Sequence, residues 1–371
     1  MRQAIVERQR KAMEAVDLDA LIASSPENFG YTTGFVVASH PLMRWRHAMS
    51  VVTRDDKVAL LTVDMEESTV RSKAAGVDTR VWGEFTDNAM DVLADLLTDL
   101  GLAKAAVGVE MDYLPAGDFK HLTERLPNVR FVAADDMFNR LREIKIPEEI
   151  ELLRKLSRIA DQSIAGSFAA VKTGMSEMDI AGALTNAVYA RGAENFKLMI
   201  VATGERSEYP NVGPTHRKLA RGDLCRVEIF PTIGGYHAGV CRTAVVQEPS
   251  ARATEIWKNL TQCKYLLLET IKPGASTREI YGAFINKFRE LNLPAIDFVG
   301  HGIGLHLHEE PYLGRYSDRA LEAGMVLAIE PLVYGRGMGF GLQNKDMVVV
   351  TETGCELLSD QTDTDALIRI P

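Results

Sequence analysis

The first part of the chain switches repeatedly between helical and extended spacing of its apolar residues. Two segments have helical spacing, and the extended runs between and after them predict strands. The helical segments are 1–24, which ends in a short strand, and 88–101; the extended runs are 49–63, a predicted hairpin, 105–110 and 129–134. This alternation predicts an α/β domain over roughly the first 140 residues.

A Pro-Glu-Glu sequence marks the start of a second domain. Pro147 suits the first turn of a helix, and Glu148 and Glu149 suit its positive N-terminal end. The helix that follows carries apolar residues on one face, at Ile150, Leu153, Leu156, Ala160, Ile164, Phe168 and Val171. We therefore predict an N-terminal domain of residues 1–143 and a C-terminal domain of residues 144–371.

Beyond that boundary one pattern occurs twice, because two helical segments are followed each time by two strand-like runs. The first set is 148–173, 177–192, 224–230 and 240–246, and the second is 251–271, 276–290, 325–334 and 346–351. This repetition predicts a domain of two similar halves. Their strands would close a curved sheet over a central cleft, with the helices outside.

Composition and charge argue against two classes of partner, nucleic acids and membranes. The 371 residues carry a net charge of -9, which argues against nucleic acid because phosphate binding needs a basic surface. The four cysteines form no CxxC pair, so we expect reduced thiols in a cytoplasmic protein, with Cys225 and Cys241 in the core. The polar N-terminus lacks a signal peptide's apolar segment, and no apolar run could span a bilayer, so we expect no membrane partner.

Ionisable residues lie inside otherwise apolar strand sequences of the C-terminal domain. Glu228 lies in RVEIF, Glu330 lies in VLAIEPLVY, and Lys345 immediately precedes the apolar run that begins at Met347. A buried charge is costly unless it is paired or functional. The plainer alternatives are a carboxylate that caps a turn at Pro331 and a solvated lysine.

The polar segments of this domain together resemble the creatinase/prolidase/aminopeptidase P family. The segments that carry the resemblance are IKIPEEIELLRK, RGDLCRVEIF, HGIGLHLHEEP, IEPLVY and DMVVVTETG, in this order within residues 141–360, with NFGYTTGF (28–35) in the N-terminal domain. The resemblance implies a small α/β N-terminal domain followed by a pita-bread domain with pseudo-two-fold halves. It also implies that His301 and His308 face the cleft; two surface histidines are the alternative.

The peptidases of this family hold two divalent ions with two aspartates, one histidine and two glutamates. The resemblance places Glu228, Gly239, His301, Glu330 and Lys345 at these positions. Gly239 offers no ligand, and a protonated lysine is a donor that repels cations, whereas hard divalent ions need several carboxylates. We therefore expect no metal and no other cofactor, with the Lys345 ammonium between Glu228 and Glu330.

Creatinase is the metal-free branch of the family, and FPTIGGYHAGVCRT and GPTHRKLARGD resemble its segments. The histidine that creatinase uses as its main acid/base corresponds to Asn211 here. His216 lies five residues further on and is a candidate replacement if its loop bends toward the cleft. Asn211, His216, Tyr236 and His237 are therefore candidates for substrate binding.

The segment MRWRHA gathers Arg44 and Arg46 beside Trp45. A basic surface turn is the simpler interpretation. In creatinase-like dimers, the N-terminal domain of one subunit completes the cleft of its partner. The resemblance therefore implies a homodimer in which Arg44 and Arg46 bind a substrate carboxylate through their guanidinium groups.

These observations favour a metal-independent hydrolase of a C–N bond in a small carboxylate-bearing amide, urea or guanidino-type substrate. We expect His308 and His301 to transfer protons, Glu330 and Glu228 to orient water or a basic nitrogen, and Lys345 to stabilise negative charge. The alternatives are an Xaa-Pro dipeptidase or aminopeptidase with a degenerate metal site, a lyase, and a family member without activity that acts as a binding protein.

Overall fold

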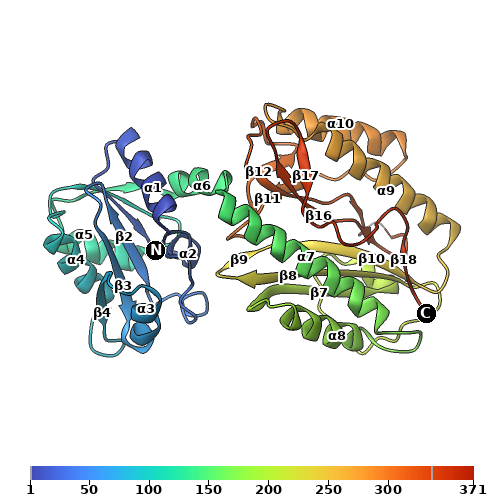
Figure 1. Cartoon of the computed structure of the whole chain (residues 1–371), viewed down its shortest axis with the longest axis horizontal. Coiled ribbons are helices and arrows are strands. Elements are labelled where there is room, and N and C mark those ends of the chain that lie inside the picture. Colours follow the sequence, from blue (N-terminus) through green and yellow to red (C-terminus); the bar gives the residue numbers. More distant parts are fainter. Residues whose placement is uncertain (1, 336) are drawn as a thin grey trace. The chain divides into compact units, whose positions relative to one another are not determined.

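The computed structural model describes residues 2–335 and 337–371. The chain divides into two compact units, Met1–Arg142 and Glu143–Pro371, and both are drawn in Figure 1.

The first unit is built on one six-stranded sheet with the order β4-β3-β2-β1-β5-β6. Its strands are β1 (Ala20–Ala23), β2 (Met49–Thr53), β3 (Val58–Val63), β4 (Asp78–Trp82), β5 (Ala106–Val109) and β6 (Arg130–Ala133). Strands β2 and β3 pair antiparallel, which confirms the predicted hairpin. Its turn needs one residue in the left-handed region, and Asp56 takes that conformation with φ 75°.

Helices cover both faces of this sheet. They are α1 (Gln3–Ala15), α2 (Pro26–Thr33), α3 (Glu67–Lys73), α4 (Ala89–Asp99), α5 (Ala116–Arg125) and α6 (Asp135–Glu143), with a 3-10 turn η1 (Asp64–Glu66). Neighbouring residues of β1 point to opposite faces, so Ile22 packs in one core with Leu93 of α4, and Leu21 packs in another with Met13 of α1. The sequence pattern predicted α1 and α4 but not α2, α3, α5, α6 or β4.

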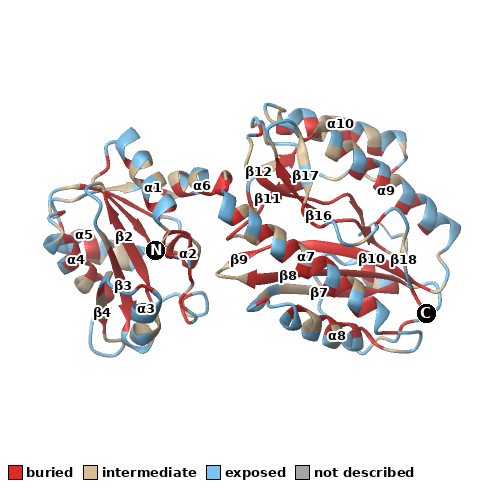
Figure 2. Ribbon diagram, viewed as in Figure 1, coloured by how far each residue is buried: buried red, intermediate tan, exposed pale blue. Residues whose placement is uncertain are grey.

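The second unit contains two larger sheets and a two-stranded pair. One sheet has the order β18-β10-β8-β7 with β9 on β8, another has the order β12-β11-β13-β16-β17, and β14 pairs with β15. The strands are β7 (Asn195–Thr203), β8 (Leu224–Ile233), β9 (Tyr236–His237), β10 (Val240–Val246), β11 (Phe298–Gly302), β12 (Glu309–Gly314), β13 (Val326–Ile329), β14 (Leu332–Val333), β15 (Leu342–Gln343), β16 (Asp346–Val350), β17 (Cys355–Leu357) and β18 (Ile368–Ile370). Most of these strands are buried, as Figure 2 shows.

The helices of this unit confirm the predicted repeat. Helices α7 (Pro147–Ala169) and α8 (Glu177–Ala190) precede β7, β8 and β10, and helices α9 (Ala251–Thr270) and α10 (Thr277–Glu290) precede β11, β13 and β16. The sequence pattern predicted two strands in each half and missed the strands outside those ranges, among them β7, β11, β12, β17 and β18. The fold is therefore the one that the resemblance implies, a small α/β domain followed by a larger domain of two similar halves.

The predicted strand 325–334 is interrupted, because Glu330 and Pro331 separate β13 from β14. Proline cannot continue a sheet ladder, so the chain leaves the sheet at Glu330. Across residues 2–335 and 337–371, no helix combines the length and apolarity that a bilayer-spanning segment requires.

Candidate active site

Three buried charges lie together in the second unit. The Lys345 Nζ is 2.9 Å from Glu228 Oε1 and 3.2 Å from Glu330 Oε2, and all three side chains are at most 6% exposed. Burial lowers the pKa of Lys345, but the two carboxylates outweigh that effect and raise it above the usual lysine value. Burial raises the pKa of Glu330, although the Lys345 ammonium acts against this. The ammonium therefore lies where the sequence predicted it.

Strand register brings Lys345 opposite Glu228. Glu228 on β8 is paired with Cys241 on β10, and Cys241 forms an antiparallel bridge with Lys345. Neighbouring strands lie about 4.8 Å apart, so a long side chain is needed to cross the intervening strand, and the small Cys241 leaves room for it. Behind this row, the buried Arg242 donates to the Lys345 carbonyl at 2.8 Å and pairs with Asp161 and Asp346. The backbone that carries Lys345 is therefore held firmly.

The ring of Phe230 occupies the space that a side chain at position 239 would need. A Cβ added to Gly239 would lie 2.3 Å from Cε1 of Phe230, which is too close for any side chain without movement of the ring. The Lys345 Nζ also lies 5.0 Å from the centre of the same ring, within the range of a cation–π interaction. Phe230 therefore both excludes a ligand at position 239 and contacts the ammonium.

A chain of hydrogen bonds orients Glu330. The buried Arg226 donates to Gln343 Oε1 at 3.1 Å, and Gln343 Nε2 donates to Glu330 Oε2 at 3.1 Å. Arg226 also donates to the carbonyl of Pro210 at 2.9 Å and thereby ties the 207–210 segment to the site. Oε2 of Glu330 thus has two donors, Gln343 and Lys345. Its other oxygen, Oε1, faces His301.

His301 and His308 lie face to face. Their ring centroids are 3.7 Å apart with an interplanar angle of 13°; His301 is fully buried and His308 is exposed. Burial lowers the pKa of both histidines, and the Lys345 ammonium lowers each further. Both imidazoles are therefore neutral at neutral pH.

The hydrogen bonds of His301 fix its tautomer. Its Nδ1 lies 2.8 Å from the carbonyl oxygen of Gly302, which can only accept, so Nδ1 carries the proton. Nε2 is therefore an unprotonated acceptor; it is buried without a hydrogen-bond partner and lies 3.6 Å from Glu330 Oε1. Two acceptors, His301 Nε2 and Glu330 Oε1, thus face each other, and a hydrogen-bond donor could bind between them.

Tyr236 and His237 are both buried, so neither points away from the protein. Tyr236 donates its hydroxyl to Glu149 Oε1 at 2.5 Å. Burial lowers the pKa of His237 to about 4. Its Nδ1 lies 3.4 Å from the carbonyl oxygen of Gly235, which can only accept, so Nε2 is a second buried acceptor without a hydrogen-bond partner. Tyr236 is thus engaged with α7, and His237 keeps a free acceptor.

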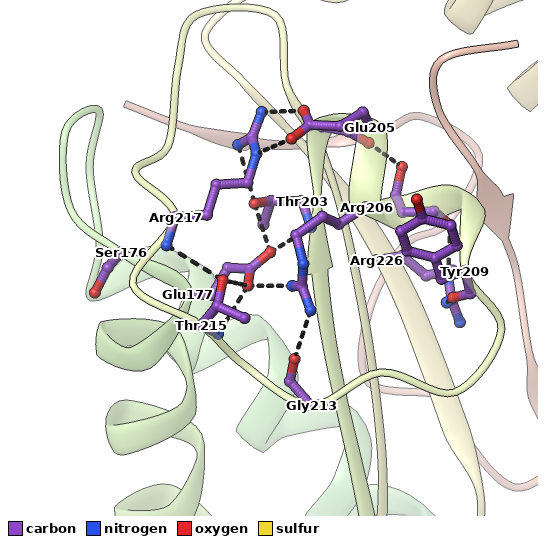
Figure 3. Close-up of polar contacts among 12 residues, drawn as sticks. Ser176, Glu177, Thr203, Glu205, Arg206, Tyr209, Gly213, Thr215, Arg217 and Arg226 are labelled. Carbon is purple, nitrogen blue, oxygen red and sulfur yellow. Dashed lines mark hydrogen bonds and ion pairs between the residues drawn. The ribbon is translucent and has the colours of Figure 1, made fainter.

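Asn211 and His216 lie on an exposed segment. Figure 3 shows how this segment is held: Glu177, at the start of α8, accepts from the backbone N–H and hydroxyl of both Thr203 and Thr215 and pairs with Arg206. Because Thr215 is fixed to Glu177, the neighbouring His216 remains on the surface. The structure therefore does not bring His216 to the Lys345 cluster.

In the first unit, the two arginines of MRWRHA differ in their surroundings. Arg46 makes a bidentate ion pair with Glu84, in which Nε donates to Oε1 at 2.7 Å and Nη2 donates to Oε2 at 2.8 Å. Arg44 is exposed, donates to the Tyr113 carbonyl at 2.6 Å and lies 5.2 Å from the centre of the Tyr113 ring. Arg44 is therefore the more available of the two for an anion.

The comparison with known proteins agrees with this architecture. Residues 151–352 match the metallopeptidase family M24, and residues 6–144 match the creatinase/prolidase N-terminal domain. The chain belongs to the M24 family. An Xaa-Pro dipeptidase from Pyrococcus furiosus is 30% identical to this M24 protein over 259 residues, 68% of this chain and 73% of the dipeptidase.

Two further relatives span nearly the whole M24 chain. A creatinase from a Bacillus species is 28% identical over 370 residues, 94% of this chain and 88% of the creatinase. The crystal structure of dipeptidase PepE from Mycobacterium ulcerans is 27% identical with a TM-score of 0.84, covering 100% of this chain and 98% of that one. Similarity thus supports an M24 hydrolase, but it does not single out the creatinase branch that the motifs favoured.

The residues of this M24 protein do not fit the dinuclear metal centre of its family. Of the five ligand positions, Gly239 is blocked by Phe230 and Lys345 places its ammonium between the two remaining glutamates. Across the described parts of the chain, no three His, Cys, Asp or Glu side chains are grouped so that they could hold a metal ion.

Three residues of the M24 site were missed by sequence reasoning. Arg226 and Phe230 flank Glu228 at two-residue intervals on β8, and Gln343 precedes Lys345 by two. Side chains two apart in a strand share a face. The alternation around the predicted residues was therefore the signal that could have found them.

Proposed function

We propose that this protein is a metal-independent M24 hydrolase that cleaves a C–N bond in a small carboxylate-bearing amide, urea or guanidino-type compound. The observation that carries the proposal is the Lys345 ammonium, which lies 2.9 Å from Glu228 and 3.2 Å from Glu330. A fixed positive charge in a buried site can stabilise developing negative charge without a metal.

The convergence of His301 and Glu330 suits a nucleophilic water. A water molecule that donates one hydrogen to His301 Nε2 and the other to Glu330 Oε1 would keep its lone pairs free to attack the substrate carbon. The neutral His301, with its proton fixed on Nδ1, is suited to act as the general base. Gln343 and Lys345 hold Glu330 in place while this happens.

The residues of the site can accept and return the protons that hydrolysis moves. The water oxygen bonds to the substrate carbon, the C–N bond breaks, and the proton taken by His301 is the one that the leaving nitrogen needs. The second proton of the water is released when the product forms, and His308, which is exposed beside His301, is placed to pass that proton to solvent. Lys345 opposes the negative charge that forms on the substrate.

The second candidate is an Xaa-Pro dipeptidase. It is favoured by the similarity to relatives such as the 30% identical Xaa-Pro dipeptidase from Pyrococcus furiosus. Glu228, His301 and Glu330 keep three of the family's ligand positions, so this candidate requires a metal to displace Lys345. It therefore predicts that activity depends on added Mn²⁺ or Co²⁺.

The test is an activity panel of Xaa-Pro dipeptides and of small amides, ureas and guanidino compounds that carry a carboxylate. Each is assayed with EDTA and with added metal, in water enriched in ¹⁸O. Turnover that survives EDTA and places ¹⁸O in the product supports the proposal. Turnover of Xaa-Pro dipeptides only with metal supports the second candidate, and product without ¹⁸O indicates a lyase.

A further inference from the structure

The segment that leads into α7 contacts the loop that carries His308. The Lys145 Nζ lies 3.1 Å from Glu309 Oε2, and the two side chains are only 1% and 4% exposed. Glu309 directly follows His308 and begins β12. A buried ion pair thus links Lys145, just before the first residue of α7, to Glu309, which follows the proposed catalytic His308.

The other oxygen of Glu309 holds the loop before His308. Glu309 Oε1 accepts from the backbone N–H of Leu305 and of His306, both at 3.2 Å. The loop between β11 and β12 contains no helix or strand of its own. The hydrogen bonds from its backbone amides to Glu309 therefore help to fix its conformation. Lys145 fixes the carboxylate, and the carboxylate fixes the loop.

The first turn of α7 also holds the segment of His237. Tyr236 donates to Glu149 Oε1 at 2.5 Å, while Glu149 Oε2 accepts from the N–H of Ile146 at 2.8 Å. The backbone N–H of His237 in turn donates to the Gly304 carbonyl at 2.9 Å. The two segments that carry His237 and His308 are therefore tied to each other and to the same helix start.

A third contact reaches the strand that leads to Glu330. The Lys145 N–H donates to the Gly324 carbonyl at 3.0 Å, just before β13. The approach is close: a Cβ on Gly324 would lie 3.2 Å from the Lys145 carbonyl oxygen, and its φ of +90° also disfavours other residues.

We propose that Lys145 and Glu309 form a positioning pair for the active site, with Glu149 as a second anchor for the His237 segment. Lys145 acts through Glu309 to hold the loop that stacks His308 on His301. The inference rests on the proton-transfer role proposed above for these histidines. A buried ion pair often contributes little net stability. Stability alone therefore does not account for the presence of the Lys145–Glu309 pair.

The experiment separates positioning from stability by comparing a single and a double variant. Lys145→Met leaves Glu309 as an unpaired buried carboxylate and is expected to destabilise the protein. Lys145→Met/Glu309→Leu replaces the pair with apolar side chains, which commonly restores stability, but it does not restore the bonds to Leu305 and His306. Arg319→Met is the matched control, since Arg319 pairs with Glu143 at 2.7 Å at the same end of the unit.

Three readouts are measured on the intact protein. Hydrogen exchange at the Leu305 and His306 amides needs no substrate, and crystal structures give the His301–His308 ring separation. The kinetic readout is kcat and KM on whichever compound of the activity panel the wild-type protein turns over. In the double variant, we expect both amides to exchange faster, and kcat to fall about 100-fold with KM within about threefold. The conservative single variant Lys145→Arg keeps a cation beside Glu309, so it should retain wild-type exchange, ring separation and kinetics, and Arg319→Met should leave all three unchanged.

A stable double variant with wild-type exchange at both amides and wild-type kcat would overturn the inference. If no compound is turned over by the wild type, the proposed hydrolase fails, and the exchange data and ring separation still decide whether Lys145 holds the loop.

Discussion

Lys345 Nζ lies 2.9 Å from Glu228 Oε1, and the two residues reach each other across the intervening strand β10. Lys345→Met would leave Glu228 and Glu330 as unopposed buried carboxylates. We expect the free energy of unfolding to fall by about 3–5 kcal/mol, measured by urea denaturation. The control is Lys345→Met combined with Glu228→Gln and Glu330→Gln, which removes all three charges and should recover most of the loss. A Lys345→Met variant as stable as wild type would contradict the buried ion triad.

The second prediction concerns metal. We expect the wild-type protein to hold far less than one equivalent of Mn, Fe, Co or Zn by elemental analysis, and EDTA to leave its activity unchanged. Conversely, Phe230→Gly/Gly239→Asp/Lys345→Glu restores a carboxylate at both altered positions and clears the space for it. This triple variant should bind Mn²⁺ in calorimetry. Gly239→Asp alone should not, because Phe230 fills the space.

One equivalent of metal in the wild-type protein, bound through Glu228, His301 and Glu330, would refute this prediction. Tight Mn²⁺ binding by Gly239→Asp alone would show that the Phe230 ring moves aside easily.

His308→Ala should lower kcat by about 100-fold or more while the protein stays folded, because loss of a proton-transfer group has effects of this size. His216→Ala is the matched control, since His216 is exposed and its neighbour Thr215 is fixed to Glu177. The measurement is steady-state kinetics with circular dichroism as the check on folding. Equal losses in both variants would return His216 to the mechanism.

The pH dependence of stability should reveal the buried His40 in the first unit. Burial lowers its pKa to about 4, whereas the unfolded chain protonates it near the ordinary value of about 6.5. Stability from this group is therefore complete above about pH 6.5 and is lost as pH falls toward 4. The loss amounts to about 2 kcal/mol between about pH 7 and pH 5, at about 1.4 kcal/mol for each unit.

His40→Gln removes this titration, so its free energy of unfolding should fall about 2 kcal/mol less than that of wild type over the same interval. Parallel curves for the two proteins would show that His40 is protonated in the folded state.

The last prediction is a homodimer with shared sites, as the resemblance to creatinase implies. Arg44 is exposed, whereas Arg46 already pairs with Glu84, so Arg44 is the better candidate for the substrate carboxylate. Arg44→Ala and His308→Ala subunits, each inactive alone, should regain partial activity when mixed, because one site then combines both intact residues. Mixed dimers without activity, or an active monomer in sedimentation, would reject the shared site.

The sequence predicted the long amphipathic helices and the charged residues of the site, but not the parts that shape it. Glu228, Glu330 and Lys345 were recognisable because a charge in an apolar strand is costly. Phe230 was not, because an aromatic residue in such a strand has the composition of ordinary core. Its function depends on Gly239, which register brings against it and which no local pattern reveals. Lys145 was missed for a similar reason, since its partner Glu309 lies 164 positions away.

The packing of Phe230 against Gly239 also bears on how such a site can change over evolutionary time. An aspartate restored at 239 would collide with the ring, and a glutamate restored at 345 would gather three carboxylates without a cation. Loss of the ring at 230 would remove a contact of the ammonium. Each single step back is therefore unfavourable by itself, although the three together are compatible. The three positions are therefore coupled: a protein with this arrangement can gain carboxylates at 239 and 345 without strain or charge repulsion only if residue 230 changes with them.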